Sequence, residues 1–298
     1  MALPHSVRIP ASTSNLGPGF DLLGLALDLF LTVELDCTGD GGDRFESLAG
    51  EATGLPQGPH NLLTRAFLAL FERLGKTPPT GRTWRVDSEI PVARGLGSSG
   101  ASTAAGLLLA CQVLGMDPAD HSALLIRLGT ELEGHPDNVV ASLLGGCVLT
   151  IQSEPEFQVI RQTVHPDLAF AVAWGQTPLP TSKARACLPG SVPFAEALDQ
   201  PRRLAALLEG LRTADPILLG HARTEHLHQE ARMGLIPGAR EALQAAHGAG
   251  AYLATISGSG SSLIAIGSHE RGEAMAEALG RALDQADGPA VWRLARPV

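Results

Sequence analysis

Apolar residues recur at helical spacing along several stretches of the chain. In residues 61–74 they fall on one stripe of a helix, and Gly75 follows where such a helix would end. Residues 99–114 are rich in alanine and leucine and are followed by Gly115, which predicts a second helix. An aspartate followed by a proline at 117–118 predicts the start of a third. The same spacing predicts further helices over 194–212, 238–247 and 270–286.

Short apolar stretches bounded by turn residues predict strands in both halves of the chain. They cover residues 31–35, 84–90, 147–151, 168–173, 252–256, 263–266 and 290–294. Residues 152–166 are polar and less regular, so we place a domain boundary there, with an N-terminal domain of residues 1–160 and a C-terminal domain of residues 161–298. Because strands and helices interleave in both domains, we expect an α+β fold.

Composition and charge narrow the class of protein. The chain has 298 residues, of which 44% are hydrophobic and 18% charged, so neither a disordered chain nor a coiled coil fits. The net charge of −9 argues against nonspecific binding to nucleic acid. No apolar run approaches the roughly 20 residues that span a bilayer. The start lacks a signal-peptide pattern, and the four cysteines are too widely spaced for a zinc or redox motif. We expect a cytoplasmic protein without nucleic-acid or membrane partners.

Glycine and serine gather in residues 91–102, between a predicted strand and a predicted helix. Glycine lets the backbone approach a ligand closely, and the start of a helix adds a partial positive charge. Together these features favour an anion site suited to phosphate. The hydroxyls of Ser98 and Ser99 could serve phosphate or a bound metal. Read alone, the segment is also compatible with a tight turn that binds nothing.

The same segment matches the dinucleotide-binding pattern G-x-G-x-x-G at Gly95, Gly97 and Gly100. Its surroundings do not fit that pattern, because Pro91 interrupts the approach where a strand should run straight into the first glycine. The acids found about 20 residues later lie at a helix start and not at the end of a second strand. A nicotinamide-dependent oxidoreductase is therefore a lesser alternative.

Three motifs along the chain resemble those of the GHMP family of small-molecule kinases. Residues 91–101 (PVARGLGSSGA) resemble the second motif, and residues 10–21 (PASTSNLGPGFD) and 257–262 (SGSGSS) resemble the other two. Within the family, the branch that acts on L-homoserine resembles this chain most. The resemblance to that branch rests on residues 15–21, 133–138, 181–185 and 232–237.

The resemblance implies a fold and an activity. The fold would be a two-domain GHMP kinase fold, with a β-α-β N-terminal domain of left-handed crossover and a ferredoxin-like C-terminal domain. The reaction would be ATP-dependent phosphorylation of the L-homoserine side-chain hydroxyl to O-phospho-L-homoserine, on the route to threonine, with Mg²⁺ as cofactor. Members of the family are commonly homodimers, so a homodimer is expected.

The resemblance also assigns residues to ATP and magnesium. ATP would contact Pro91, Arg94, Gly95, Leu96, Gly97, Ser98, Ser99, Gly100 and Ala101. Magnesium, a hard cation that prefers oxygen ligands, would lie close to Ser99 and to a carboxylate that precedes the Asp-Asn pair. We assign that carboxylate to Glu133 and keep Glu131 in reserve. Without the resemblance, both glutamates would be solvated charges at a helix end.

A zwitterionic amino-acid substrate needs an anion for its ammonium group and guanidinium groups for its carboxylate. The resemblance supplies Asn15 and Asp21 for the amino end. For the carboxylate end it supplies Thr181, Arg185 and Arg232, and Gly258 also belongs to the substrate-binding set. Residues 257–260 would pack against the glycine-rich segment and close the site.

The resemblance places catalysis at Ser99, Asp137 and Asn138. Several branches of the family carry an aspartate where this chain has Asn138, and asparagine cannot take up a proton at neutral pH. Either Asp137 acts as the base, or no base is needed and Asn138 orients the hydroxyl. We favour orientation, because a loose transition state leaves the proton of the nucleophile until late. His135 is interpreted as structural.

Three other functions are weighed against this one. A related kinase acting on mevalonate or a sugar would have no ammonium partner for Asp21. A nicotinamide-dependent oxidoreductase would use the glycines of residues 95–100. A nucleotide-binding regulator without turnover is suggested only by Asn138.

Overall fold

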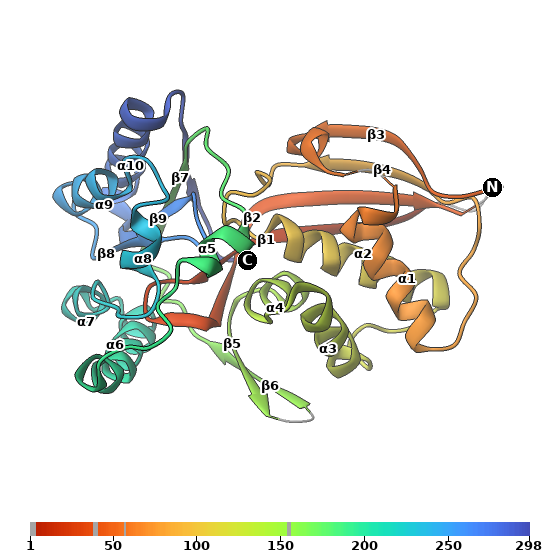
Figure 1. The fold of residues 1–298 in the computed structure, drawn as a ribbon, viewed down its shortest axis with the longest axis horizontal. Helices are drawn as coiled ribbons and strands as arrows, with labels where there is room; N and C mark the ends of the chain where they lie inside the picture. The colour runs from red at the N-terminus through yellow and green to blue at the C-terminus, as the bar shows by residue number, and fades with distance from the viewer. Residues whose placement is uncertain (1–3, 38–40, 57, 154–155) are drawn as a thin grey trace.

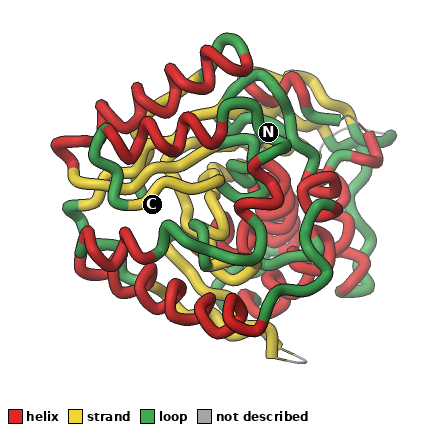
Figure 2. Tube along the Cα trace, turned by 60° about the vertical axis from the view of Figure 1, so that its left-hand side comes forward, coloured by secondary structure: helices red, strands yellow, loops and turns green. Residues whose placement is uncertain are grey.

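The computed structural model describes residues 4–37, 41–56, 58–153 and 156–298. The strands form two sheets, and helices cover them from outside in both halves of the molecule (Figures 1 and 2). The first sheet and its helices come from the first half of the chain, and the second sheet comes from the second half. The structure therefore has the two-domain arrangement and the mixed α and β content expected from the sequence.

The first sheet is built around one long strand, β2. It contains β1 (His5–Asn15), β2 (Gly19–Asp36), β3 (Arg44–Gly50), β4 (Thr83–Ser88), β5 (Cys147–Ser153) and β6 (Glu156–Gln162). The strand order is β3-β4-β2-β5-β6, with β1 paired along the other edge of β2. Short 3₁₀ turns at Glu51–Gly54 and Gly58–His60 follow β3. The sheet is packed against α1 (Leu62–Arg73), α2 (Ser98–Leu114), α3 (Ser122–Glu133) and α4 (Asp137–Leu144).

The second sheet is antiparallel and has the strand order β10-β7-β9-β8. Its strands are β7 (Leu168–Trp174), β8 (Leu253–Ile256), β9 (Leu263–Ser268) and β10 (Val291–Ala295). Between β7 and β8 lie α5 (Thr181–Ala186), α6 (Phe194–Thr213), α7 (Pro216–His221), α8 (Gln229–Met233) and α9 (Ala239–Gly248). A 3₁₀ turn (His269–Arg271) and α10 (Gly272–Asp287) join β9 to β10. This order of strands and helices is that of a ferredoxin-like domain.

The helix predicted over residues 61–74 is confirmed as α1 and shows why its sequence forms a helix. The side chain of Asn61 accepts a hydrogen bond from the Leu63 amide at 2.8 Å and so caps the first turn. The apolar stripe, including the fully buried Phe67, faces the core. The ring of Phe67 meets Trp84 of β4 edge-on, with 5.6 Å between ring centroids. Helix α1 is thus fixed to the sheet by its aromatic face.

Two expectations from the sequence are wrong. The third helix begins at Ser122 and not at residues 117–118, because the Asp117 carboxylate binds the Ala119 amide and residues 118–121 close a separate turn. Part of the segment expected to be irregular forms a strand, since β6 (Glu156–Gln162) pairs with β5 and extends the first sheet. The division at residue 160 stays a prediction, and so does the handedness of the β3-α1-β4 crossover.

The topology does not fit a dinucleotide-binding fold. Within the described residues only β3 and β4 pair in parallel, and the glycine-rich segment follows β4, which is antiparallel to β2. Such a fold needs a glycine turn between neighbouring parallel strands. None of the described helices is long and apolar enough to cross a membrane.

Truncating Phe67 tests the packing of α1. We expect Phe67→Ala to lower the free energy of unfolding by about 3–5 kcal/mol, because it leaves a cavity beneath Trp84. Phe194→Ala is the matched control; its side chain is 78% exposed, so the change should stay below about 0.5 kcal/mol. Urea unfolding followed by far-UV circular dichroism measures both, and equal effects would contradict the packing described.

Candidate active site

A cavity of about 320 Å³ opens between the two halves of the molecule. Most of the predicted site residues line it, namely Asn15, Asp21, Arg94, Gly95, Gly97, Ser98, Ser99, Asp137, Asn138, Thr181, Arg185 and Arg232. The other predicted site residues do not line it: Pro91, Leu96, Gly100, Ala101, Glu133 and Gly258. Residues far apart in the sequence, from β1 to α8, therefore meet at one cavity.

One wall is the glycine-rich segment that leads into α2. Gly95 and Gly97 have φ values of 79° and 72°, and a Cβ on Gly97 would lie 2.1 Å from Ser12 Oγ. The helix begins at Ser98, and its N-cap, Gly97, has no side chain to accept from the first amides. These amides and the Ser98 and Ser99 hydroxyls border the cavity, so this end of α2 suits an anion.

The loop between β8 and β9 packs directly against this segment. Ser257 Oγ donates to the Gly95 carbonyl at 2.7 Å, and the Ser262 amide donates to the Arg94 carbonyl at 2.7 Å. The Gly258 amide donates to the Ser14 carbonyl at 3.0 Å. Gly258 therefore lies behind the cavity wall, where its carbonyl holds other site residues in place.

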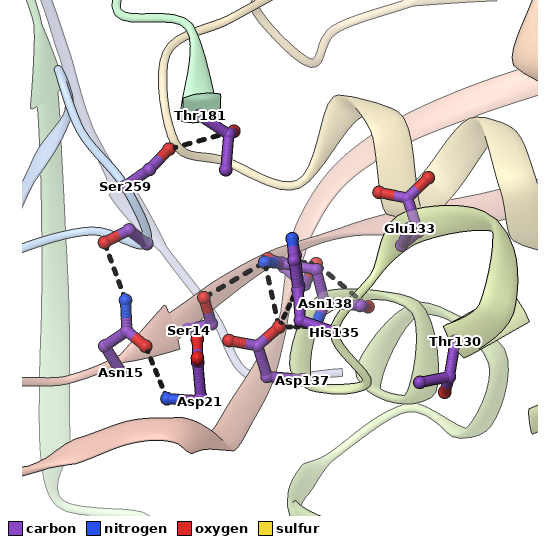
Figure 3. Close-up of polar contacts among 12 residues, drawn as sticks. Ser14, Asn15, Asp21, Thr130, Glu133, His135, Asp137, Asn138, Thr181 and Ser259 are labelled. Atoms are coloured by element: carbon purple, nitrogen blue, oxygen red, sulfur yellow. Dashed lines mark hydrogen bonds and ion pairs between the residues drawn. The ribbon is translucent and has the colours of Figure 1, made fainter. Parts of the chain in front are cut away.

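Asn138 lies in a buried network of hydroxyl groups (Figure 3). Its Oδ1 accepts from Ser12 Oγ at 3.1 Å, and its Nδ2 donates to Ser14 Oγ at 3.0 Å and towards Asp137 Oδ1 at 3.4 Å. Both hydrogens of Nδ2 are thus engaged, while Oδ1 keeps one lone pair. In this orientation the amide can accept a hydrogen bond from a hydroxyl in the cavity.

Asp137 and His135 form a buried pair next to Asn138 (Figure 3). His135 Nδ1 and Asp137 Oδ1 are 2.6 Å apart, and the Asn138 amide donates to the same oxygen at 2.8 Å. Burial alone would raise the pKa of Asp137, but the hydrogen bonds from His135 and from the Asn138 amide hold this pKa below its ordinary value. Burial alone would lower the pKa of His135, but Asp137 holds it above 6.5. Asp137 is therefore a weak base.

Asp21 and Arg185 face the cavity as an ion pair. Two parallel hydrogen bonds of 2.9 and 2.8 Å join the guanidinium to the carboxylate, and both side chains are 37% exposed. The hydrogen bonds to Asp21 raise the pKa of Arg185. Asn15 supports the turn before Asp21, because its Oδ1 accepts from the Asp21 amide and its Nδ2 donates to the Gly258 carbonyl at 2.7 Å. Asn15 and Asp21 both have positive φ values, a strained backbone often found at binding sites.

Arg232 is a buried cation at the wall of the cavity. Only 2% of the residue is exposed, yet none of the described carboxylates lies within ion-pair distance of its guanidinium. Its Nε donates to the Ala184 carbonyl and one Nη donates to the Gly258 carbonyl, both at 3.1 Å. A buried charge without an opposite charge is costly, so this position favours an anionic ligand.

The structure distinguishes the two glutamates at the end of α3. Glu133 accepts a hydrogen bond from Thr103 at 2.7 Å, and Thr103 lies one turn after Ser99 on α2. Glu131 instead pairs with Arg73 of α1 and is half exposed. Ser99 and Glu133 therefore lie near the same end of α2 and offer the oxygen donors that a hard cation prefers.

Several residues of the site were not found from the sequence. Ser12 and Ser14, which orient Asn138, could have been noticed as part of a polar run in a strand otherwise rich in apolar residues. The segment before α1 gives no comparable signal. It contributes Leu55, Pro56, His60 and Asn61 to the cavity wall, and Leu62, the first residue of α1, lines it too.

Comparisons with known proteins agree on a family. The model of the GHMP kinases N terminal domain matches residues 61–146, and that of the GHMP kinases C terminal matches residues 207–285. Homoserine kinase from Gloeobacter violaceus is 42% identical over 279 residues, which cover 92% of this chain and 91% of that protein. Homoserine kinase from Moorella thermoacetica is 39% identical over 262 residues, which cover 87% and 86%.

Solved structures give the same result at the level of the fold. The crystal structure of homoserine kinase from Cytophaga hutchinsonii matches 100% of this chain and 96% of that chain, with a TM-score of 0.86 and 30% sequence identity. Mevalonate kinase from Methanococcus jannaschii matches 99% and 98%, with a TM-score of 0.71 but only 14% identity. The second similarity shows the shared fold alone.

A pH series tests the pair of His135 and Asp137. Since the pKa of His135 in the folded protein is above 6.5, the pair stabilises fully below pH 6.5 and its contribution is lost as pH rises through the raised pKa. The difference in unfolding free energy between wild type and His135→Gln, measured by urea denaturation, should therefore shrink as the pH rises above 6.5.

His247 provides a control of opposite sign. Burial lowers its pKa, so the stability of the wild type relative to His247→Gln should fall as the pH drops below 6.5. If the difference in unfolding free energy between wild type and His135→Gln instead grew with pH, this result would contradict the pairing of His135 with Asp137.

Proposed function

This chain belongs to the GHMP kinase family and, within it, to the homoserine kinases, and on that premise we propose that it transfers the terminal phosphoryl group of ATP to the side-chain hydroxyl of L-homoserine. The products are ADP and O-phospho-L-homoserine, an intermediate on the route to threonine. The observation that carries this proposal is one cavity that joins an uncapped helix start, a buried guanidinium without an ion-pair partner among the described residues and a half-buried acid. These three features fit a phosphate, a carboxylate and an ammonium group.

ATP is proposed to bind along the glycine-rich segment and the start of α2. The first amides of α2 have no capping side chain and border the cavity, which supports binding of the phosphates there. Residues 91–101 include members such as Leu96 and Ala101 whose side chains are fully buried. These two would act through the backbone or by holding the segment in shape. The apolar residues before α1 offer a surface for the base.

Magnesium is proposed to be held by Ser99 and Glu133. The fit rests on the chemistry of the donors, since a hydroxyl and a carboxylate are hard oxygen ligands near the same helix end. Among the described residues no cluster of three His, Cys, Asp or Glu side chains could hold a metal. The ion would therefore keep water and phosphate oxygens as its other ligands. When bound, it neutralises charge on the phosphates.

L-Homoserine is proposed to bind between Asp21 and the two arginines. Its ammonium group binds the Asp21 carboxylate, and its carboxylate binds the guanidinium groups of Arg185 and Arg232. Asp21 and Arg185 are already paired with each other, so the zwitterion exchanges one set of charge contacts for another. Thr181 lies at the mouth of the cavity, within 3.3 Å of the Ser259 hydroxyl.

Asn138 is proposed to orient the reacting hydroxyl. Because both hydrogens of Nδ2 are engaged, only Oδ1 of Asn138 can face a ligand. Oδ1 accepts a hydrogen bond from the substrate hydroxyl, which orients the lone pairs of the hydroxyl oxygen towards the phosphoryl group. Asp137 is held ionised by His135, and its lowered pKa makes it a poor proton acceptor. Positioning therefore contributes more here than general base catalysis.

Two further properties belong to the same proposal. We infer a cytoplasmic location, which fits the four cysteines that are all free in the structure. We also infer a homodimer, on the ground of family resemblance alone.

An ADP-release assay tests the function. The protein is supplied with ATP and Mg²⁺ and, side by side, with L-homoserine, mevalonate or galactose. We expect turnover with L-homoserine only. Turnover with mevalonate or galactose in its place would contradict the substrate while leaving the family unchanged.

Removing Arg232 should weaken recognition of the carboxylate. We expect Arg232→Ala to lower kcat/KM for L-homoserine by roughly 30- to 4000-fold, which corresponds to about 2–5 kcal/mol, with little change in KM for ATP. Arg240→Ala is the matched control, because Arg240 is half exposed and forms an ion pair with the exposed Glu230. Unchanged kinetics for Arg232→Ala would remove this residue from the substrate site.

The two glutamates of α3 make a matched pair for the metal. Glu133→Gln should raise the Mg²⁺ concentration needed for half-maximal activity by about tenfold or more, because it removes a charged oxygen ligand. Glu131→Gln should leave this concentration unchanged, because Glu131 faces Arg73. Magnesium titrations of both variants measure the effect. If only Glu131→Gln raised the required Mg²⁺ concentration, Glu131 and not Glu133 would be the metal ligand.

A further inference from the structure

His228 is a buried histidine that has no role in the binding scheme above. Its side chain is fully buried just before α8, the helix that carries Arg232. It does not line the cavity, but it contacts residues that do. Its contacts run to two parts of the proposed substrate site.

The two ring nitrogens of His228 have different partners. Nε2 is 3.0 Å from the carbonyl oxygen of Gly17, which can only accept, so Nε2 carries the proton. Nδ1 is 3.4 Å from an Nη of Arg232, which can only donate, so Nδ1 offers a lone pair. Both contacts are satisfied together only by the neutral imidazole with its proton on Nε2.

Phe20 completes the support of the guanidinium. Its ring stacks on His228, with 4.9 Å between ring centroids and an angle of 21° between the planes. The guanidinium of Arg232 lies over the same ring at 5.2 Å from its centroid. Phe20 directly precedes Asp21, so this stack links the two ends of the proposed substrate site.

Burial keeps His228 neutral despite the charged groups around it. Glu225 lies 3.7 Å away on the segment before α8, Arg232 follows one turn later, and Asp21 lies on β2. Burial lowers the pKa of His228 below its ordinary value, and Arg232 acts in the same direction. Glu225, the Gly17 carbonyl and Asp21 oppose this shift without overcoming it. Glu225 is itself engaged by the amides of residues 227–229.

We propose that His228 is a positioning residue, which fixes the guanidinium of Arg232 for the substrate carboxylate through its Nδ1 lone pair and is itself fixed by Gly17. With the carbonyls of Ala184 and Gly258, it is the third acceptor that holds this guanidinium. The remaining Nη has no partner among the hydrogen bonds of the described residues and is left for the ligand. The inference rests on the proposed function of Arg232.

Two substitutions distinguish the roles of the two ring nitrogens of His228. The amide of Asn reaches the position of Nδ1, so His228→Asn can keep a hydrogen-bond acceptor for Arg232 while it loses the hydrogen bond to the Gly17 carbonyl. The amide of Gln reaches the position of Nε2, so His228→Gln can keep a donor for Gly17 while losing the acceptor. Both variants lose the stacking on Phe20, which makes them matched controls for each other.

Steady-state kinetics give the main readout. We expect His228→Gln to raise KM for L-homoserine by about tenfold or more, because a hydrogen bond to a charged group is lost, with kcat and KM for ATP within about threefold of the wild type. His228→Asn should keep KM for L-homoserine within about threefold of the wild type. An equal rise in both variants, or none in His228→Gln, would overturn the proposal.

NMR of the imidazole groups in the wild type tests independently which ring nitrogen of His228 carries the proton. In protein labelled with ¹⁵N-histidine, long-range ¹H–¹⁵N correlations at about pH 7.5 should show His228 with its proton on Nε2 and none on Nδ1. The signal that disappears in His228→Asn assigns the residue. A proton on Nδ1 would overturn the proposal even if a variant failed to fold.

Absence of wild-type turnover with L-homoserine would instead contradict the proposed function. The tautomer measured by NMR would still report on the contact between His228 and Arg232. The two failures are therefore distinguishable.

Discussion

Contact between two glycine-containing loops, one from each half of the chain, sets the shape of the cavity. A Cβ on Gly95 would lie 2.3 Å from the Ser257 carbonyl oxygen, so no side chain fits where the loops touch. The hydrogen bonds across this contact, from Ser257 to Gly95 and from Ser262 to Arg94, end on backbone carbonyls. The start of α2 and the walls contributed by the second half are thus held in one arrangement by close packing of the two loops and by hydrogen bonds to their backbone carbonyls.

Local patterns in the sequence predicted much of this architecture. Helices α1 and α2 and all four strands of the second sheet follow from apolar spacing and from glycine at helix ends, because these signals act within a few residues. The three motifs predicted the family, which the comparisons confirm. The roles assigned to single residues stay predictions, although most of those residues do line one cavity.

What the sequence could not provide depends on contacts between distant residues. Strand β6 carries Phe157 and Val159 on the face that packs against the core, but this alternation covers only a few residues and Ile160 is exposed, so the pairing with β5, and not the sequence, reveals the strand. Asp21 and Arg185 were assigned to opposite ends of the substrate, and only the structure shows that they contact each other. The difference between Glu131 and Glu133 likewise follows from their neighbours, Arg73 and Thr103.

The pair of Asp21 and Arg185 also bears on how a ligand arrives. The opposite charges of Asp21 and Arg185 cancel at a distance, and a zwitterionic ligand carries no net charge. The ion pair and the ligand therefore exert no long-range electrostatic attraction on each other. The encounter rate of such a ligand should then hardly respond to ionic strength. ATP differs, since a strongly anionic nucleotide approaches a molecule of net charge −9 and gains its attraction only close to the helix start. The two substrates thus meet the same cavity under different electrostatic regimes.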